Sequence, residues 1–207
     1  MNSRGPHGLI GLGVAALLLL PLVASAERID PRLSARLNTS TARAVQSEID
    51  RAHMEGLPTE PLVMKALEGA AKGASGRKIA TVVHRHAMAL GDASRALGPA
   101  TTEAELVAGA GAILCGAPTD SLRSLRAARG DSSVVIPLVV ISDLLARRVP
   151  PREAAEIVVG AWRAGASATD LLRLREGIHR DIQEGMEPSA AALRARVTTD
   201  RGRTETR

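Results

Sequence analysis

Six short turns that recur along the chain set the strongest limit on its fold. Their sequences are EGLPTE, KGASGR, CGAPTD, RRVPPR, AGASAT and EGMEPS. Five place glycine directly after a helical segment and the sixth has arginine there, at Gly56, Gly73, Gly116, Arg148, Gly165 and Gly185. Glycine enters the left-handed conformation that ends a helix without a Cβ clash, and a following Pro, Ser or Thr starts the next helix. The turns therefore predict short helices joined into αα-hairpins.

The segments between the turns predict an all-α domain over residues 39–197, with about eight or nine short helices in stacked antiparallel hairpins. Thr102 and Glu105 have the T-x-x-E spacing of a capping box. The other expected helices begin at or after Thr39 or Ser40, Thr59, Ser75, Thr119, Ser133, Pro151, Ser167 and Pro188.

The run VVIPLVVI, at Val134 to Ile141, is the one segment with a strand-like pattern, because β-branched residues favour strands. Pro137 would remove a hydrogen-bond donor from a central strand, and no second run of this kind exists to pair with it. We therefore expect a helix here, with a buried strand as the alternative.

A longer repetition relates residues 56–75 to residues 148–167, 92 positions later. Pro58 matches Pro150, and the sequence Gly-Ala-Ser occurs at the end of both segments. Apolar residues at 62, 63, 66, 67 and 70 match those at 154, 155, 158, 159 and 162, which is the spacing of one buried helix face. Either an internal duplication or the shared pattern of short helical hairpins explains this match.

The ends of the chain differ from the helical middle. Residues 1–26 have a basic start, an apolar stretch and the small residues Ala-Ser-Ala, the three parts of a cleavable signal peptide. We expect cleavage after Ala26 and a periplasmic or secreted protein, because the apolar stretch is short for a membrane span. Residues 27–38 should form a loose lead-in, and the polar residues 198–207 a disordered tail.

The composition is unusual, since the chain has no Phe or Tyr and a single Trp. Leu, Val, Ile, Ala and Met must then fill the core, and we expect Trp162 in it. The formal charge is +5, but basic residues alternate with acidic ones and no aromatic rings are available to stack on bases. Nucleic acid is therefore not an expected partner.

The segment GLPTEPLVMKALEGAAKG, at residues 56–73, resembles a segment of exported bacterial Ala/Leu-rich helical proteins that have no known activity. This resemblance implies an exported helical protein of bacterial origin. It implies no catalytic residue.

Four residues are weak candidates for metal binding: His84, His86, Glu176 and His179. On a helix, His84 and His86 would point about 200° apart, so an exposed basic patch with Arg85 is the better interpretation. Glu176 and His179 have the E-x-x-H spacing of di-iron bundles, which need two such motifs and two further Glu. Asp50 and His53 only imitate it, so a surface pair is the default interpretation.

Other residues with special chemistry have structural interpretations. Cys115 lacks a nearby histidine and should be a small buried hydrophobe. Gly109 and Gly111 should allow a neighbouring helix to approach closely. We assign no catalytic residue and expect no cofactor.

These features predict an exported, non-enzymatic interaction or scaffold protein with no membrane span in the mature chain. Its partner would be another envelope protein or an anionic envelope polymer. The alternatives are an envelope-associated metal-binding protein or enzyme that uses His84, Glu176 and His179, or an electrostatic binder of anionic polymers.

Overall fold

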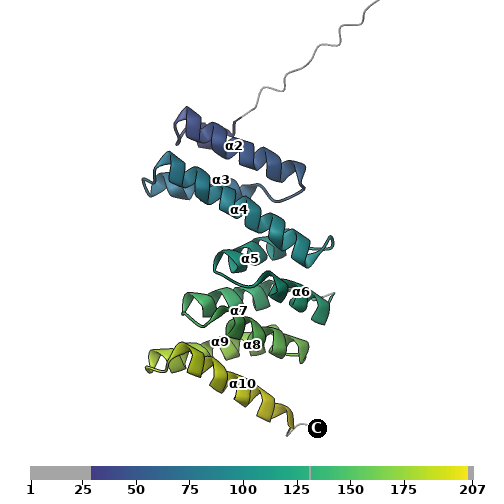
Figure 1. Ribbon diagram of the computed structural model, residues 1–207. Coiled ribbons are helices and arrows are strands. Elements are labelled where there is room, and N and C mark those ends of the chain that lie inside the picture. The colour runs from purple at the N-terminus through teal and green to yellow at the C-terminus, as the bar shows by residue number, and fades with distance from the viewer. Residues whose placement is uncertain (1–28, 131, 205–207) are drawn as a thin grey trace, which may run out of the picture.

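The structure is a computed structural model that describes residues 29–130 and 132–204 (Figure 1). These residues form an all-α protein with ten helices and no strand. The helices are α1 Pro31–Ser34, α2 Thr39–Met54, α3 Glu60–Ala71, α4 Gly76–Leu97, α5 Glu103–Leu114, α6 Thr119–Ala128, α7 Val135–Ala146, α8 Pro151–Arg163, α9 Ala168–Gln183 and α10 Pro188–Thr204. The predicted all-α class is confirmed.

The helices follow one another along an elongated molecule, with α2 near one end and α10 at the other (Figure 1). Beyond α4 they form two layers. In one layer α5 packs on α7 and α7 on α9; in the other α4 packs on α6, α6 on α8 and α8 on α10. This arrangement is compatible with stacked hairpins.

All six predicted turns have the same backbone conformation. In the first, Gly56 has φ +69° and Leu57 N–H donates to Ala52 O over 2.8 Å, which closes the last turn of α2. The other four glycines also have positive φ. Arg148 adopts φ +65° and is the one non-glycine in this region of φ among the described residues. The turn therefore imposes its conformation even where the sequence lacks glycine.

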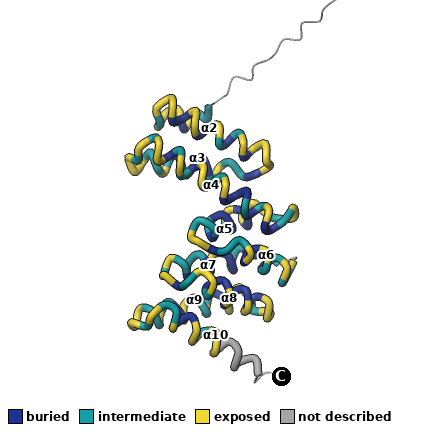
Figure 2. The backbone as a smooth tube through the Cα atoms, in the orientation of Figure 1, coloured by how far each residue is buried: buried dark blue, intermediate teal, exposed yellow. Residues whose placement is uncertain are grey.

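Buried residues recur along the whole stack, as the dark blue segments of Figure 2 show. Leu, Val, Ile and Ala fill this core together with Trp162, which is only 4% exposed, as expected. The expected contribution of methionine is largely wrong, because Met54, Met64 and Met88 are each more than half exposed. Core filling therefore depends on small and branched aliphatic side chains.

The segment VVIPLVVI lies in α7, which confirms the helix over the strand. α7 begins at Val135, so Pro137 stands in its first turn, where a backbone N–H has no partner within the helix. The capping box of Thr102 and Glu105 is also confirmed. The cap of α2 is Asn38 rather than Thr39 or Ser40, because the Asn38 side chain reaches Thr41 N–H over 2.9 Å.

Both ends of the described chain contain more helix than the sequence analysis expects. The lead-in at residues 27–38 includes α1, whose Leu33 is fully buried. At the other end, α10 continues beyond residue 197 to Thr204. The predicted signal peptide, residues 1–26, lies outside the described residues.

A buried carboxylate joins the middle of the array. Glu105 is 3% exposed; its Oε1 accepts from Val134 N–H over 3.0 Å, and its Oε2 pairs with the Arg126 guanidinium at 2.9 Å. Burial by itself would raise the pKa of Glu105, but the hydrogen bonds from Thr102 and Val134 and the pairing with Arg126 together hold it below its ordinary value. This carboxylate therefore ties α5, α6 and the start of α7 together.

Candidate functional site

The structure separates the two histidines of α4. His84 is half exposed, and its Nδ1 lies 3.2 Å from Glu48 Oε2 on α2. His86 lies near Lys65 and Glu68 of α3; burial and then the positive charge of Lys65 lower its pKa. The two imidazoles thus meet different helices, as their spacing predicts.

Glu176 and His179 belong to a charged contact between α7 and α9. Arg147 donates through Nε to Nδ1 of His179 and pairs with Asp143 at 2.5 Å. A hydrogen bond from Arg175 lowers the pKa of the exposed Glu176 carboxyl. This E-x-x-H pair is thus held by arginines.

Asp50 and His53, which have the same spacing with aspartate in place of glutamate, are likewise not paired with each other. Asp50 Oδ1 accepts from Gln46 Nε2 over 2.8 Å, while His53 is exposed. Within the described residues, no three His, Cys, Asp or Glu side chains come close enough to hold a metal ion. The candidate ligands are therefore distributed over separate helix contacts.

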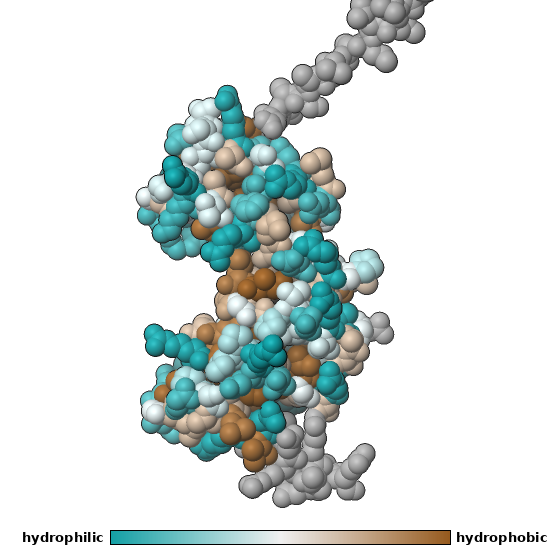
Figure 3. Space-filling model, in the orientation of Figure 1, coloured by the Kyte–Doolittle hydropathy of each residue, from teal (hydrophilic) through white to brown (hydrophobic). Residues whose placement is uncertain are grey.

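Cys115 is exposed, so the prediction of a buried thiol is wrong. It follows α5, which from Leu106 to Leu114 is apolar around its whole circumference: Leu106 is buried on one side, while Val107 is 41% exposed on the other. Figure 3 shows hydrophobic surface at the narrow middle of the molecule, where α5 lies. An apolar pattern without a polar face cannot indicate which side meets the core.

The two glycines of α5 have different surroundings. A Cβ on Gly109 would lie 3.0 Å from Ala93 Cβ of α4 and 3.2 Å from a Leu122 methyl group of α6, which confirms the close approach. A Cβ on Gly111 would meet nothing within 4 Å, so the same interpretation is wrong there.

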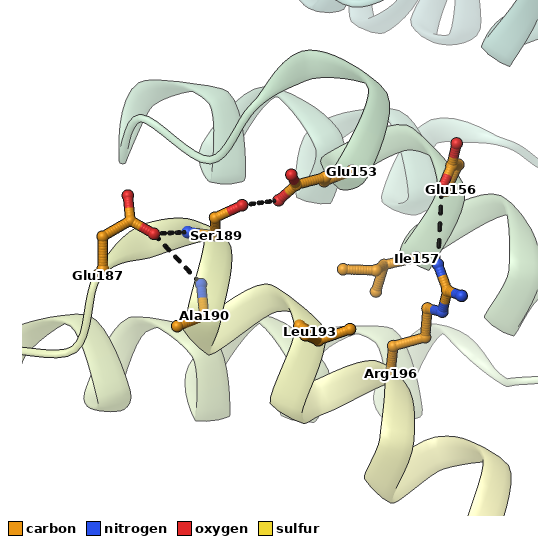
Figure 4. Close-up of a pocket in the computed structure, with 8 residues that line it drawn as sticks. All are labelled: Glu153, Glu156, Ile157, Glu187, Ser189, Ala190, Leu193 and Arg196. Atoms are coloured by element: carbon orange, nitrogen blue, oxygen red, sulfur yellow. Dashed lines mark hydrogen bonds and ion pairs between the residues drawn. The ribbon is translucent and has the colours of Figure 1, made fainter.

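A groove of about 450 Å³ lies between α8 and α10 (Figure 4). Pro151 starts α8 and Pro188 starts α10, and the first turns of the two helices are in contact. The Ser189 hydroxyl donates to Glu153 Oε2, and Ser189 N–H donates to Glu187 Oε2 over 2.8 Å. Ala190 N–H donates to the same Glu187 oxygen over 3.3 Å. These contacts fix two carboxylates at one end of the groove.

Apolar side chains form the middle of this groove and a weak ion pair lies at its other end (Figure 4). Ile157 of α8 is buried, whereas Leu193 of α10 is 59% exposed. Glu156 lies 3.6 Å from Arg196, and both side chains are more than half exposed. The lining thus combines three carboxylates, one guanidinium and an accessible apolar surface.

A second hollow, of about 390 Å³, lies on the other side of α8, against α6. It shares Glu156 with the first, and its lining includes Gly160, whose Cβ would have no neighbour within 4 Å. The two hollows therefore adjoin across α8. Sequence analysis assigned no role to these residues, since Glu153 and Glu156 look like an ordinary solvated helix face.

No helix in the described part of the chain combines the length and the apolar character that a bilayer span requires. Comparison with protein-family models, with curated protein sequences and with solved structures gives no match.

Proposed function

We propose that the protein is an exported, non-enzymatic interaction module whose α6–α8–α10 face binds a segment of a partner protein. The observation that supports this most directly is the pair of adjoining hollows that share Glu156. Helical arrays bind extended partners on surfaces of this kind, between successive helices. Leu193, exposed beside the first hollow, offers apolar contact area.

Gly160 supports the same proposal. Glycine inside a helix costs about 1 kcal/mol relative to alanine, yet no neighbouring atom requires glycine at this position. A side chain here would extend into the hollow between α6 and α8. Its absence allows a partner's backbone to approach α8.

Export is the second part of the proposal, and it rests on the signal-like residues 1–26. N-terminal sequencing of the protein from a bacterial envelope fraction should find a chain that begins at Glu27. A chain that retains residues 1–26 would contradict export by cleavage.

The binding face can be tested with a photo-crosslinking amino acid, benzoylphenylalanine, in place of Arg163, an exposed residue that lines the hollow between α6 and α8. The matched control places it at Arg85 of α4, which is also exposed. Irradiation of an envelope fraction should attach one defined protein to position 163 and not to position 85. Equal labelling at both positions, or none at either, would overturn the proposed face.

A metal-dependent activity built on His84, Glu176 and His179 is the weaker candidate. His84 contacts α2, whereas His179 contacts α7, and each is held by a charged neighbour. No observation favours this activity, or the binding of anionic polymers, over the groove.

A further inference from the structure

We infer that the groove between α8 and α10 selects a positively charged amphipathic helix of the partner. This inference rests on the proposed function, because it names the chemistry of a segment that this face would bind.

The groove is locally acidic on a protein whose formal charge is +5. Glu153, Glu156 and Glu187 line it, opposed by Arg196 alone. At 3.6 Å and more than half exposed, the Glu156–Arg196 contact is weak, so a partner's lysine or arginine can replace Arg196. Cations are thus attracted here and anions repelled.

The carboxylates at the other end of the groove retain capacity for a partner. The backbone N–H groups of Ser189 and Ala190 donate to Oε2 of Glu187, and the Ser189 hydroxyl donates to Oε2 of Glu153. A carboxylate has two acceptor oxygens, so the second oxygen of each can accept from an ammonium or guanidinium group. The groove therefore offers cation contacts at both ends.

The apolar contacts between these ends follow helical spacing. Ala190 and Leu193 are one turn apart on α10 and line the groove with Ile157 of α8. Val197, four residues after Leu193, is 43% exposed. A helix that fits such a groove presents apolar residues at positions i, i+3 and i+4. The adjoining hollow lies across α8 and is lined by Arg152 and Arg163 as well as Asp120 and Glu156, so the excess of acidic side chains belongs to the groove between α8 and α10.

The probe is a fluorescent peptide of about 18 residues, long enough to be helical, made of leucine and lysine in an amphipathic pattern. Its control has glutamate in place of every lysine. Fluorescence anisotropy should show that the lysine peptide binds the full chain and that the glutamate peptide does not. Affinity should fall as salt is raised, because exposed charge pairs are screened.

Variants assign this binding to the groove. The double variant Glu153→Gln, Glu156→Gln should weaken binding of the lysine peptide by about fivefold or more. Leu193→Gln should weaken it as well, and circular dichroism should show an unchanged fold because Leu193 is largely exposed. The matched control is Glu176→Gln, which removes an exposed carboxylate on α9 outside the groove and should leave the affinity unchanged.

The outcomes separate this inference from the proposed function. Equal binding of the lysine and glutamate peptides would overturn the inference of a cationic helix. A loss of affinity in Glu176→Gln as large as that in the Glu153→Gln, Glu156→Gln variant would overturn it as well. If position 163 still crosslinks a defined protein, the proposed function stands without the cationic helix. If neither peptide binds and no protein is crosslinked, both proposals fail.

Discussion

The segments α2–α4 and α7–α9 have turns of the same conformation at a distance of 92 residues, but the residue with positive φ in the first turn differs. The first turn has Gly56 in one segment and Arg148 in the other, at φ +69° and +65°. In both, the following residue donates back to the preceding helix, from Leu57 to Ala52 over 2.8 Å and from Val149 to Leu144 over 3.1 Å. The tertiary structure therefore holds this turn even against the preference of arginine.

The contacts between the first and third helices of the two segments differ much more. Where α7 and α9 meet, His179 is hydrogen-bonded to Arg147. The residues 92 positions earlier are Ala87 and Glu55, and these line a hollow of about 150 Å³ between α2 and α4. The turns and the apolar stripes are thus shared, while the polar residues beside them are not.

Replacement of Trp162 should have the largest effect on stability. Trp162 of α8 occupies the position that Ala70 has in α3. Trp162 is 4% exposed and lies under the Arg129 guanidinium, 4.1 Å from the ring centroid. Trp162→Ala should destabilise the protein by about 3–5 kcal/mol, through lost burial and a cavity. Urea unfolding followed by circular dichroism measures this. The control Ala70→Gly should cost about 1 kcal/mol; similar losses from both would mean that the two stripes are equivalent.

The next effect concerns Glu105, which lies between the two segments. Its pKa is lowered from an ordinary value of 4.5, so its stabilising contribution is complete above that pH and is lost as pH falls through the folded-state pKa. Glu105→Gln should cost about 2–4 kcal/mol at pH 7, because Arg126 is left without its charge partner. Unfolding at pH 7 and at pH 3 tests both points. A variant whose stability changes with pH just as the wild type's does would contradict this role.

Substitutions in the first turn should change stability by a smaller amount, and in opposite directions in the two segments. Arg148→Gly should stabilise the protein by up to about 1 kcal/mol, since a left-handed conformation strains a residue with a side chain. Gly56→Ala should destabilise it by a similar amount. Thermal unfolding of both variants measures the shift. If Arg148→Gly lowers the melting temperature, Arg148 makes a stabilising contact that outweighs this strain.

The smallest effect is expected at Gly160, whose counterpart in α3 is Glu68. Glu68 contacts Lys65 at 2.6 Å, so a side chain is accommodated at that position of the first segment. Gly160→Ala should stabilise α8 by about 0.5–1 kcal/mol, because its Cβ meets open space. Gly109→Ala, in contrast, should destabilise the protein through its contact with Ala93. A loss of stability in Gly160→Ala would show that the glycine has a structural reason.

Local sequence signals predicted much of the fold because they act within a few residues. The capping box of Thr102 and Glu105 and the six turns have their predicted places. The candidate groove could not be predicted in this way. Glu153 and Glu187 are far apart in sequence, and they come together only because α10 packs on α8.

The sequence by itself determined the six turns and the helix ends beside them, since capping and turn formation depend on adjacent backbone groups. It also determined which faces are buried wherever one face is polar. Only the tertiary structure decided which side of the apolar part of α5, Leu106 to Leu114, faces the core, and that Cys115 is exposed beside it. It likewise decided the groove, because the packing of α6, α8 and α10 sets which helix surfaces stay open.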